Sequence, residues 1–93
     1  MLISSTVLAD NSKHTVMPEQ GYVPNANTAI SIAEAVWLPI YGEGINDKKP
    51  FVAKLHGDTW VVKGSLPAQM LGGVPVAEIS KKTGVILMIS HGK

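Results

Sequence analysis

Residues 26–42 read ANTAISIAEAVWLPIYG, and they decide the fold because they contain the one clear helical pattern in the chain. Asn25 precedes the pattern and is a residue type preferred at a helix N-cap. Pro39 lacks an amide donor, so we expect the helix to kink or stop there, with Gly42 completing its end. The apolar side chains recur at helical spacing and fall on one face: Ala29, Ile32, Ala33, Val36, Trp37 and Ile40.

From residue 51 onward the apolar residues alternate, which is the pattern of half-buried β-strands. The last run, VILMISH at residues 85–91, is almost entirely apolar. It predicts a central strand that is covered on both faces or completed by a partner. We therefore expect an α+β fold, in which one N-terminal helix packs on a four-stranded antiparallel meander sheet. The four strands form two hairpins, at residues 51–55 and 59–64 and at residues 76–80 and 85–91.

The length of 93 residues suits a single domain, which we place at residues 25–93. Residues 1–24 are predicted to be a signal-peptide remnant followed by an extended lead-in. The segment Met1–Ala9 is apolar, and its end fits a signal-peptidase site with cleavage after Ala9. We therefore expect a periplasmic protein. The alternative is a short strand or a disordered tail at residues 1–9 in a cytoplasmic protein.

The composition argues against several classes of function. Eight basic and seven acidic residues give a net charge of +1, which is too little to attract nucleic acid or a membrane surface. The chain has no cysteine, which excludes disulfides, thiolate zinc sites and a cysteine nucleophile. No apolar run approaches the ~20 residues that a membrane span needs.

The sequence also lacks the spacings that catalytic and metal sites require. His14, His56 and His91 are too scattered to suggest metal ligands. There is no Gly-x-Ser-x-Gly motif, and Gly72-Gly73 is not followed by the lysine of a phosphate-binding loop. We therefore expect neither an enzyme nor a protein that holds a cofactor or a metal.

Several segments in combination resemble a known family, over about residues 21–93. They resemble the bacterial immunity proteins described as having a nuclear-transport-factor-two-like fold, which protect against polymorphic toxins and type VI secretion effectors. Because the chain is short for that complete fold, the resemblance implies a cystatin-like or truncated nuclear-transport-factor-two-like sheet. The segments that carry it are residues 21–24, 28–42, 50–51, 60–67, 72–75 and 78–87, with the final His91-Gly92-Lys93.

The resemblance implies an immunity protein that acts in interbacterial competition. Such a protein binds and neutralises a cognate bacterial toxin or effector by occluding its active site, and it catalyses nothing. Two alternatives stay open. One is a PepSY-like periplasmic module that inhibits or assists a peptidase, and the other is a small enzyme or ligand carrier on a cone-shaped sheet. A homodimer is compatible with the sequence, whereas nothing in it suggests membrane insertion.

The predicted contacts with the partner lie in a loop and at the ends of elements. The loop between the second and third predicted strands is apolar and glycine-rich, and methionine adapts well to a partner surface. Two further residues follow the proline of the helix, and two lie at the C-terminal end. The predicted set is Tyr41, Glu43, Gln69, Met70, Leu71, Gly72, Gly73, His91 and Lys93.

Overall fold

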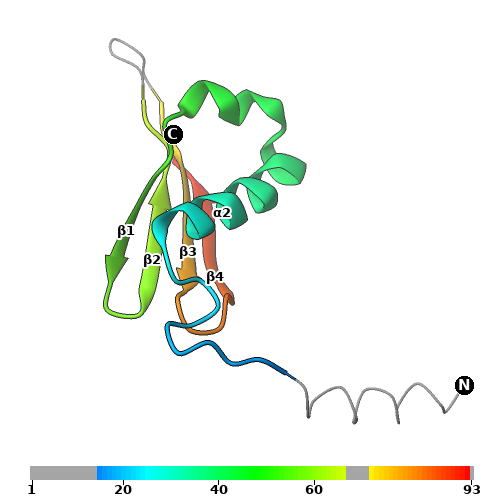
Figure 1. Cartoon of the computed structure of the whole chain (residues 1–93). Coiled ribbons are helices and arrows are strands. Elements are labelled where there is room, and N and C mark those ends of the chain that lie inside the picture. The colour runs from blue at the N-terminus through cyan, green and yellow to red at the C-terminus, as the bar shows by residue number, and fades with distance from the viewer. Residues whose placement is uncertain (1–14, 67–71, 93) are drawn as a thin grey trace, which may run out of the picture.

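The computed structural model describes residues 15–66 and 72–92 and shows one helix lying across a four-stranded sheet (Figure 1). The predicted α+β fold is confirmed, and each strand boundary lies within one residue of its predicted position. No helix in the described residues is long and apolar enough to cross a membrane. In chain order the elements are α2 (Ala26–Tyr41), the 3-10 helix η1 (Glu43–Lys48), β1 (Val52–His56), β2 (Thr59–Lys63), β3 (Pro75–Ser80) and β4 (Ile86–His91).

Helix α2 begins at the predicted cap. The side-chain carbonyl oxygen of Asn25 accepts hydrogen bonds from the backbone N–H and the hydroxyl of Thr28, each at 2.9 Å. The helix continues through Pro39 and ends at Tyr41, where the amide of Gly42 donates to the carbonyl of Leu38 at 2.8 Å. Of the two expected effects of Pro39, the stop does not occur. The side chain of Tyr41 packs against the core, and this contact holds the last turn in place despite the proline.

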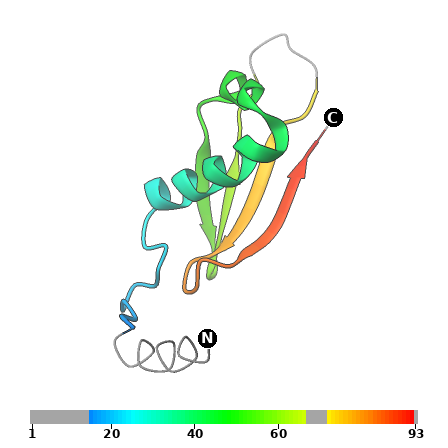
Figure 2. The same cartoon turned by 90° about the vertical axis from the view of Figure 1, so that its right-hand side faces the viewer.

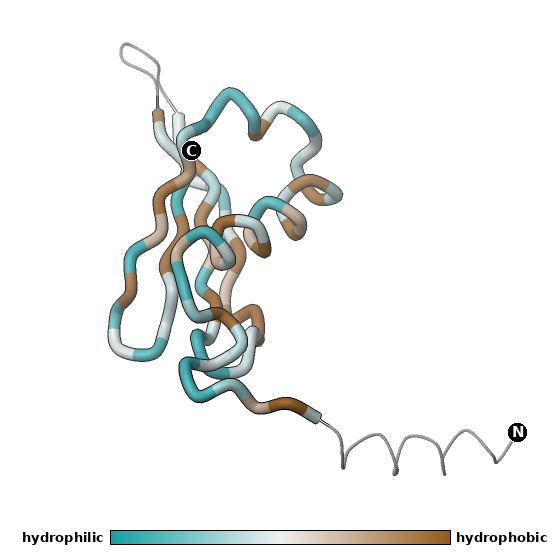
Figure 3. Tube along the Cα trace, in the orientation of Figure 1, coloured by the Kyte–Doolittle hydropathy of each residue, from teal (hydrophilic) through white to brown (hydrophobic). Residues whose placement is uncertain are grey.

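The segment between α2 and β1 forms a short helical element. Residues Glu43–Lys48 form a 3-10 helix, and its one apolar residue, Ile45, is 2% exposed. In Figure 3 this segment is hydrophilic apart from a single hydrophobic position. One buried side chain among polar ones creates no periodic pattern, so the sequence does not predict a helix in this segment.

The sheet is a meander in the order β1-β2-β3-β4, and all its neighbouring strands are antiparallel. Strand β4 therefore lies at an edge, and the prediction of a central strand is wrong. The side chains of its apolar run lie in different surroundings. Ile89 packs against the core, while a register shift opposite Glu78 and Ile79 inserts Leu87 as an extra residue that is 52% exposed.

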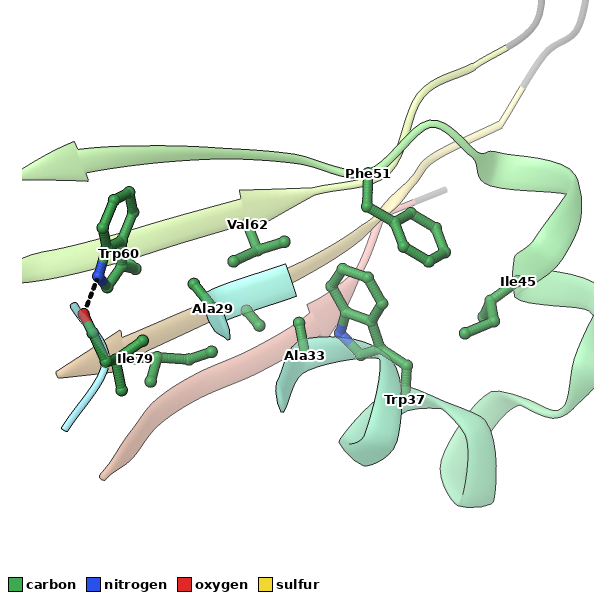
Figure 4. Close-up of a cluster of buried hydrophobic side chains, with 10 residues drawn as sticks. Ala29, Ala33, Trp37, Ile45, Phe51, Trp60, Val62 and Ile79 are labelled. Carbon is green, nitrogen blue, oxygen red and sulfur yellow. Dashed lines mark hydrogen bonds between the residues drawn. The ribbon is translucent and has the colours of Figure 1, made fainter. Parts of the chain in front are cut away.

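The core lies between α2 and one face of the sheet (Figure 2). Trp37, in the middle of the helix stripe, is fully buried and meets the ring of Phe51 edge-on at a centroid distance of 5.1 Å. The sheet contributes Val62 and Ile79, which are also fully buried (Figure 4). Trp60 on β2 is also buried, at 8% exposed.

A short strap, residues 21–23, fixes the N-terminal side of the domain to the β3–β4 turn. The amides of Tyr22 and Val23 donate to the carbonyls of Lys82 and Lys81 at 3.0 and 2.9 Å. Gly21 has a φ of +88°, and a Cβ there would lie 2.5 Å from the Lys81 carbonyl oxygen, so only glycine fits this approach. The carbonyl of Val23 in turn accepts a 2.8 Å hydrogen bond from Trp60 Nε1 (Figure 4).

Candidate partner-binding surface

The structure brings two of the predicted contact residues together. Tyr41, the last residue of α2, and His91, the last residue of β4, face each other with ring centroids 5.1 Å apart and planes tilted by 60°. Tyr41 is half-buried against the core, whereas His91 is exposed. The pair therefore presents an aromatic surface that is supported from below and open to a partner.

The two predicted glycines lie beside this pair. Gly73 packs so tightly against Gly92 that a Cβ on it would come within 1.9 Å of the Gly92 carbonyl carbon. The Gly92 amide also donates to the Val74 carbonyl at 3.2 Å. Gly73 therefore has a structural reason to be glycine, since it holds the chain end next to His91. Gly72 is exposed.

Glu43 is exposed at the start of η1. Figures 1 and 2 both show η1 at the same end of the molecule as the end of β4. We call this region the Tyr41–His91 end and define it by Tyr41, Glu43, Gly72, Gly73 and His91. The other predicted contact residues, Gln69, Met70, Leu71 and Lys93, lie outside the described residues.

A second surface was missed by the sequence analysis. It is an open groove of about 440 Å³ on the face of the sheet that points away from α2. The register places Val52 opposite Lys63 and Lys54 opposite Val61, so that apolar and basic side chains alternate across the hairpin. The groove is lined by Val52, Lys54, His56, Val61, Lys63 and Gly64.

The alternation of the strands could have revealed this groove. If Phe51 and Ala53 face the helix, Val52 and Lys54 must face the other way. The predicted strand ended at Leu55, but His56 is the last residue of β1 and continues the same row. The neighbouring Glu78 on β3, opposite Val61, is half-buried and brings one negative charge to this face.

The described residues hold no cluster of three or more metal-ligating side chains. The ion pair between Lys49 and Glu34 spans 3.7 Å at a partly exposed site, where such pairs contribute at most about 1 kcal/mol. No side-chain polar atom that is buried in the described part of the chain lacks a hydrogen-bond partner. The surface features of the described residues include the aromatic rings at one end and the basic groups in the groove.

Comparison with known proteins places this architecture in a family. Two curated proteins of Escherichia coli (strain K12) are similar. "Uncharacterized protein YbbC" is 40% identical over 73 residues, covering 76% of this chain and 60% of that protein. "Uncharacterized protein YhhH" is 35% identical over 83 residues, covering 87% of this chain and 63% of that protein. The chain thus spans about three fifths of the length of these relatives.

No solved structure matches the chain. The family described as NTF2 fold immunity protein matches residues 28–93, which run from the first turn of α2 to the end of the chain and include both aromatic partners of the Tyr41–His91 end. A match over this much of the domain assigns the whole helix-and-sheet unit rather than one motif. The chain belongs to the family of NTF2 fold immunity proteins.

Proposed function

We propose that this protein binds a cognate bacterial toxin and neutralises it by covering the toxin's active site. The observation that carries the proposal is the family match over residues 28–93. Because the matched family consists of immunity proteins, it favours toxin neutralisation over the peptidase-accessory alternative. In this role the chain supplies a rigid surface and takes no part in a reaction.

We assign the toxin contact to the Tyr41–His91 end. Aromatic side chains with firm support are the usual anchors of protein interfaces, and Tyr41 is held by the core while His91 stays exposed. Enzyme active sites are themselves concave. The end of a sheet can enter such a cleft, whereas the groove over β1 and β2 is hollow and would have to receive a part of the toxin instead.

In this proposal the protein binds the toxin in the periplasm, where a type VI secretion system of a competing cell would deliver it. The support for it is the apolar segment Met1–Ala9, which lies outside the described residues. Cells that express the full chain are fractionated, and the periplasmic fraction is probed for the protein with its N-terminus sequenced. Cleavage after Ala9 supports this location, and an uncleaved protein confined to the cytoplasm contradicts it.

The main experiment tests neutralisation directly. The toxin gene beside the gene for this protein is expressed from an inducible promoter in a sensitive host, with and without the full chain. We expect growth to be restored, and the purified toxin to lose its activity at an equimolar amount of the protein. A toxin that stays fully active in an excess of folded protein contradicts the proposal.

A matched pair of variants tests the assigned surface. His91→Glu and Lys54→Glu each place a carboxylate at an exposed position, one at the Tyr41–His91 end and one in the groove. We expect His91→Glu to weaken toxin binding by about 10–100-fold, which corresponds to the loss of an interface anchor. Lys54→Glu should leave the affinity unchanged. The reverse order in a calorimetric titration would assign the toxin to the groove.

A further inference from the structure

The two edges of the sheet differ in how they are protected against pairing with another strand. Natural proteins commonly guard exposed edges with charged side chains and prolines. Edge strand β1 follows Pro50 and carries Lys54 in its centre. Edge strand β4 has no such residue, and the run from Val85 to Ser90 contains no charge and no proline. The edge formed by β4 is therefore open to pairing.

The side chains along this edge are apolar and reach solvent. Val85, Ile86 and Leu87 are consecutive and are 54%, 38% and 52% exposed. The bulge at Leu87 bends the beginning of the strand, and bulges can discourage edge pairing. It ends before Met88, however, and the regular register with β3 continues from there to His91. A straight edge flanked by exposed apolar side chains remains.

The backbone directions show which groups this edge offers. The Gly92 amide donates to Val74, which fixes residue 92 as facing β3. Because directions alternate in an antiparallel pair, Ser90 and Met88 also face β3, and the amides and carbonyls of Ile89 and His91 point away from it. No strand in the described part of the chain lies on that side. Unpaired backbone groups therefore point outward from the strand.

We propose that two copies of this chain pair through β4, antiparallel and about a two-fold axis, to form one continuous sheet. A two-fold contact uses the same patch on both copies, so the patch must be complementary to itself. An uncharged strand meets this condition, because pairing it with its own copy brings no like charges together. The same pairing through β1 would bring the Lys54 side chains of the two copies near each other.

The charge of the whole chain also permits this self-pairing. With a net charge of +1, two copies repel each other only weakly at long range. The contact is limited to one strand and its flanking side chains, so it falls at the small end of interface size, and we expect a dissociation constant on the order of 10 µM. The dimer needs no toxin, and this inference is therefore independent of the proposed function.

Sedimentation equilibrium of the full chain alone, over a concentration series, tests the inference. We expect the mass to rise with concentration from 9.9 kDa to about twice that value. Leu87→Lys should raise the dissociation constant at least about 10-fold, because each copy then adds a charge to the shared edge. Leu55→Lys is the matched control on β1, where Leu55 is 44% exposed. It should leave the dissociation constant of the dimer unchanged.

Hydrogen exchange of the unmodified chain gives a second measurement that does not depend on any variant. The backbone amide of Gly64 donates to the carbonyl of Pro75, so by alternation the backbone groups of Trp60 also face β3. Leu55 on β1 is paired with Trp60, and its amide therefore points away from the sheet. The amide of Ile89 points away from the sheet at the other edge, on β4. We expect the exchange of the Ile89 amide to slow as the concentration rises. Exchange of the Leu55 amide should stay the same.

Two results would overturn the inference. One is a monomeric mass up to about 1 mM, a concentration at which even a weak specific dimer forms. The other is an Ile89 amide that slows only when the purified toxin is added, which would assign this edge to a strand of the toxin. Failure of neutralisation, by contrast, would leave the measured mass and exchange unaffected, so the two proposals fail separately.

Discussion

The two faces of the sheet are built from the same strands but differ in what covers them. On the helix side, Val62, Ala77 and Ile79 are fully buried beneath α2. On the opposite side, the neighbouring positions include Val52, which is 45% exposed, and the two lysines of the groove. Adjacent residues of one strand therefore have different roles, because successive side chains point to opposite faces.

This difference suggests how the small domain divides its tasks. A single-layer sheet with one helix has only one core, so the stability of the fold depends on the covered face. The open face and the two ends are free to carry recognition, since substitutions there remove little buried surface. If this division holds, substitutions on the helix side lower the free energy of unfolding more than matched substitutions on the open face.

The largest effect is expected for Trp37→Ala. Trp37 is fully buried, meets Phe51 at 5.1 Å, and forms the centre of the helix side. Its truncation should lower the free energy of unfolding by about 3–5 kcal/mol, which is a large part of the stability of a domain this size. Urea denaturation followed by circular dichroism measures the change. A loss below about 1 kcal/mol would show that α2 is not the main source of stability.

Trp60→Phe should have the next largest effect. It removes the Nε1 donor and leaves the carbonyl of the fully buried Val23 without its 2.8 Å partner. We expect a loss of about 1–3 kcal/mol. Tyr22→Phe serves as the control, because its hydroxyl donates to the Val16 carbonyl at an exposed site, where water can take its place. Equal losses of unfolding free energy in the two variants would show that the buried hydrogen bond from Trp60 to Val23 stabilises the fold no more than the exposed one from Tyr22 to Val16.

A pair of neighbouring substitutions tests the contrast between the faces within one strand. Val62→Thr introduces a hydroxyl into a fully buried site of the same shape, at a cost of about 1–3 kcal/mol. Val61→Thr makes the identical change on the groove side, where water can reach the hydroxyl, and should stay within about 0.5 kcal/mol. Thermal unfolding of the two variants under the same conditions gives the comparison.

The smallest effect is expected for Lys54→Glu, which reverses a charge in the groove. Lys54 is exposed and has no ion-pair partner among the described residues, so the free energy of unfolding should change by less than about 0.5 kcal/mol. A chemical denaturation curve measures this. A much larger loss would mean that the open face contributes to stability and that the division between the faces is incomplete.

Local pattern predicted most of the fold. Asn25 capped the helix as expected, and the strand boundaries followed because alternation and turn residues are properties of neighbouring positions. The same approach failed for β4. An apolar run predicts side chains that avoid water, yet Ile86 and Leu87 are exposed. Strand order depends on which strands meet in space, and the bulge at Leu87 has no local signature.

The candidate surface was predicted residue by residue, but not as an arrangement. Tyr41 and His91 were both singled out, yet their contact joins the end of α2 to the end of β4, and no sequence spacing reports it. Gly73 was predicted as a contact residue because its loop is apolar and glycine-rich, whereas its close packing against Gly92 gives the glycine a structural role. Alternation along β1 is enough to place Val52 and Lys54 on the face away from α2, but the register of β1 on β2 is needed to bring Lys63 into the same surface.

The strap at residues 21–23 has a practical consequence for any binding assay. It leads the described chain away from the sheet at the β3–β4 turn, and Figures 1 and 2 show that the Tyr41–His91 end lies at the opposite end of the sheet. A protein immobilised on a sensor chip through an affinity tag on its N-terminal side would therefore display that end toward the solution. A tag at the C-terminus would put the chip beside His91 and block the surface that the assay is meant to probe.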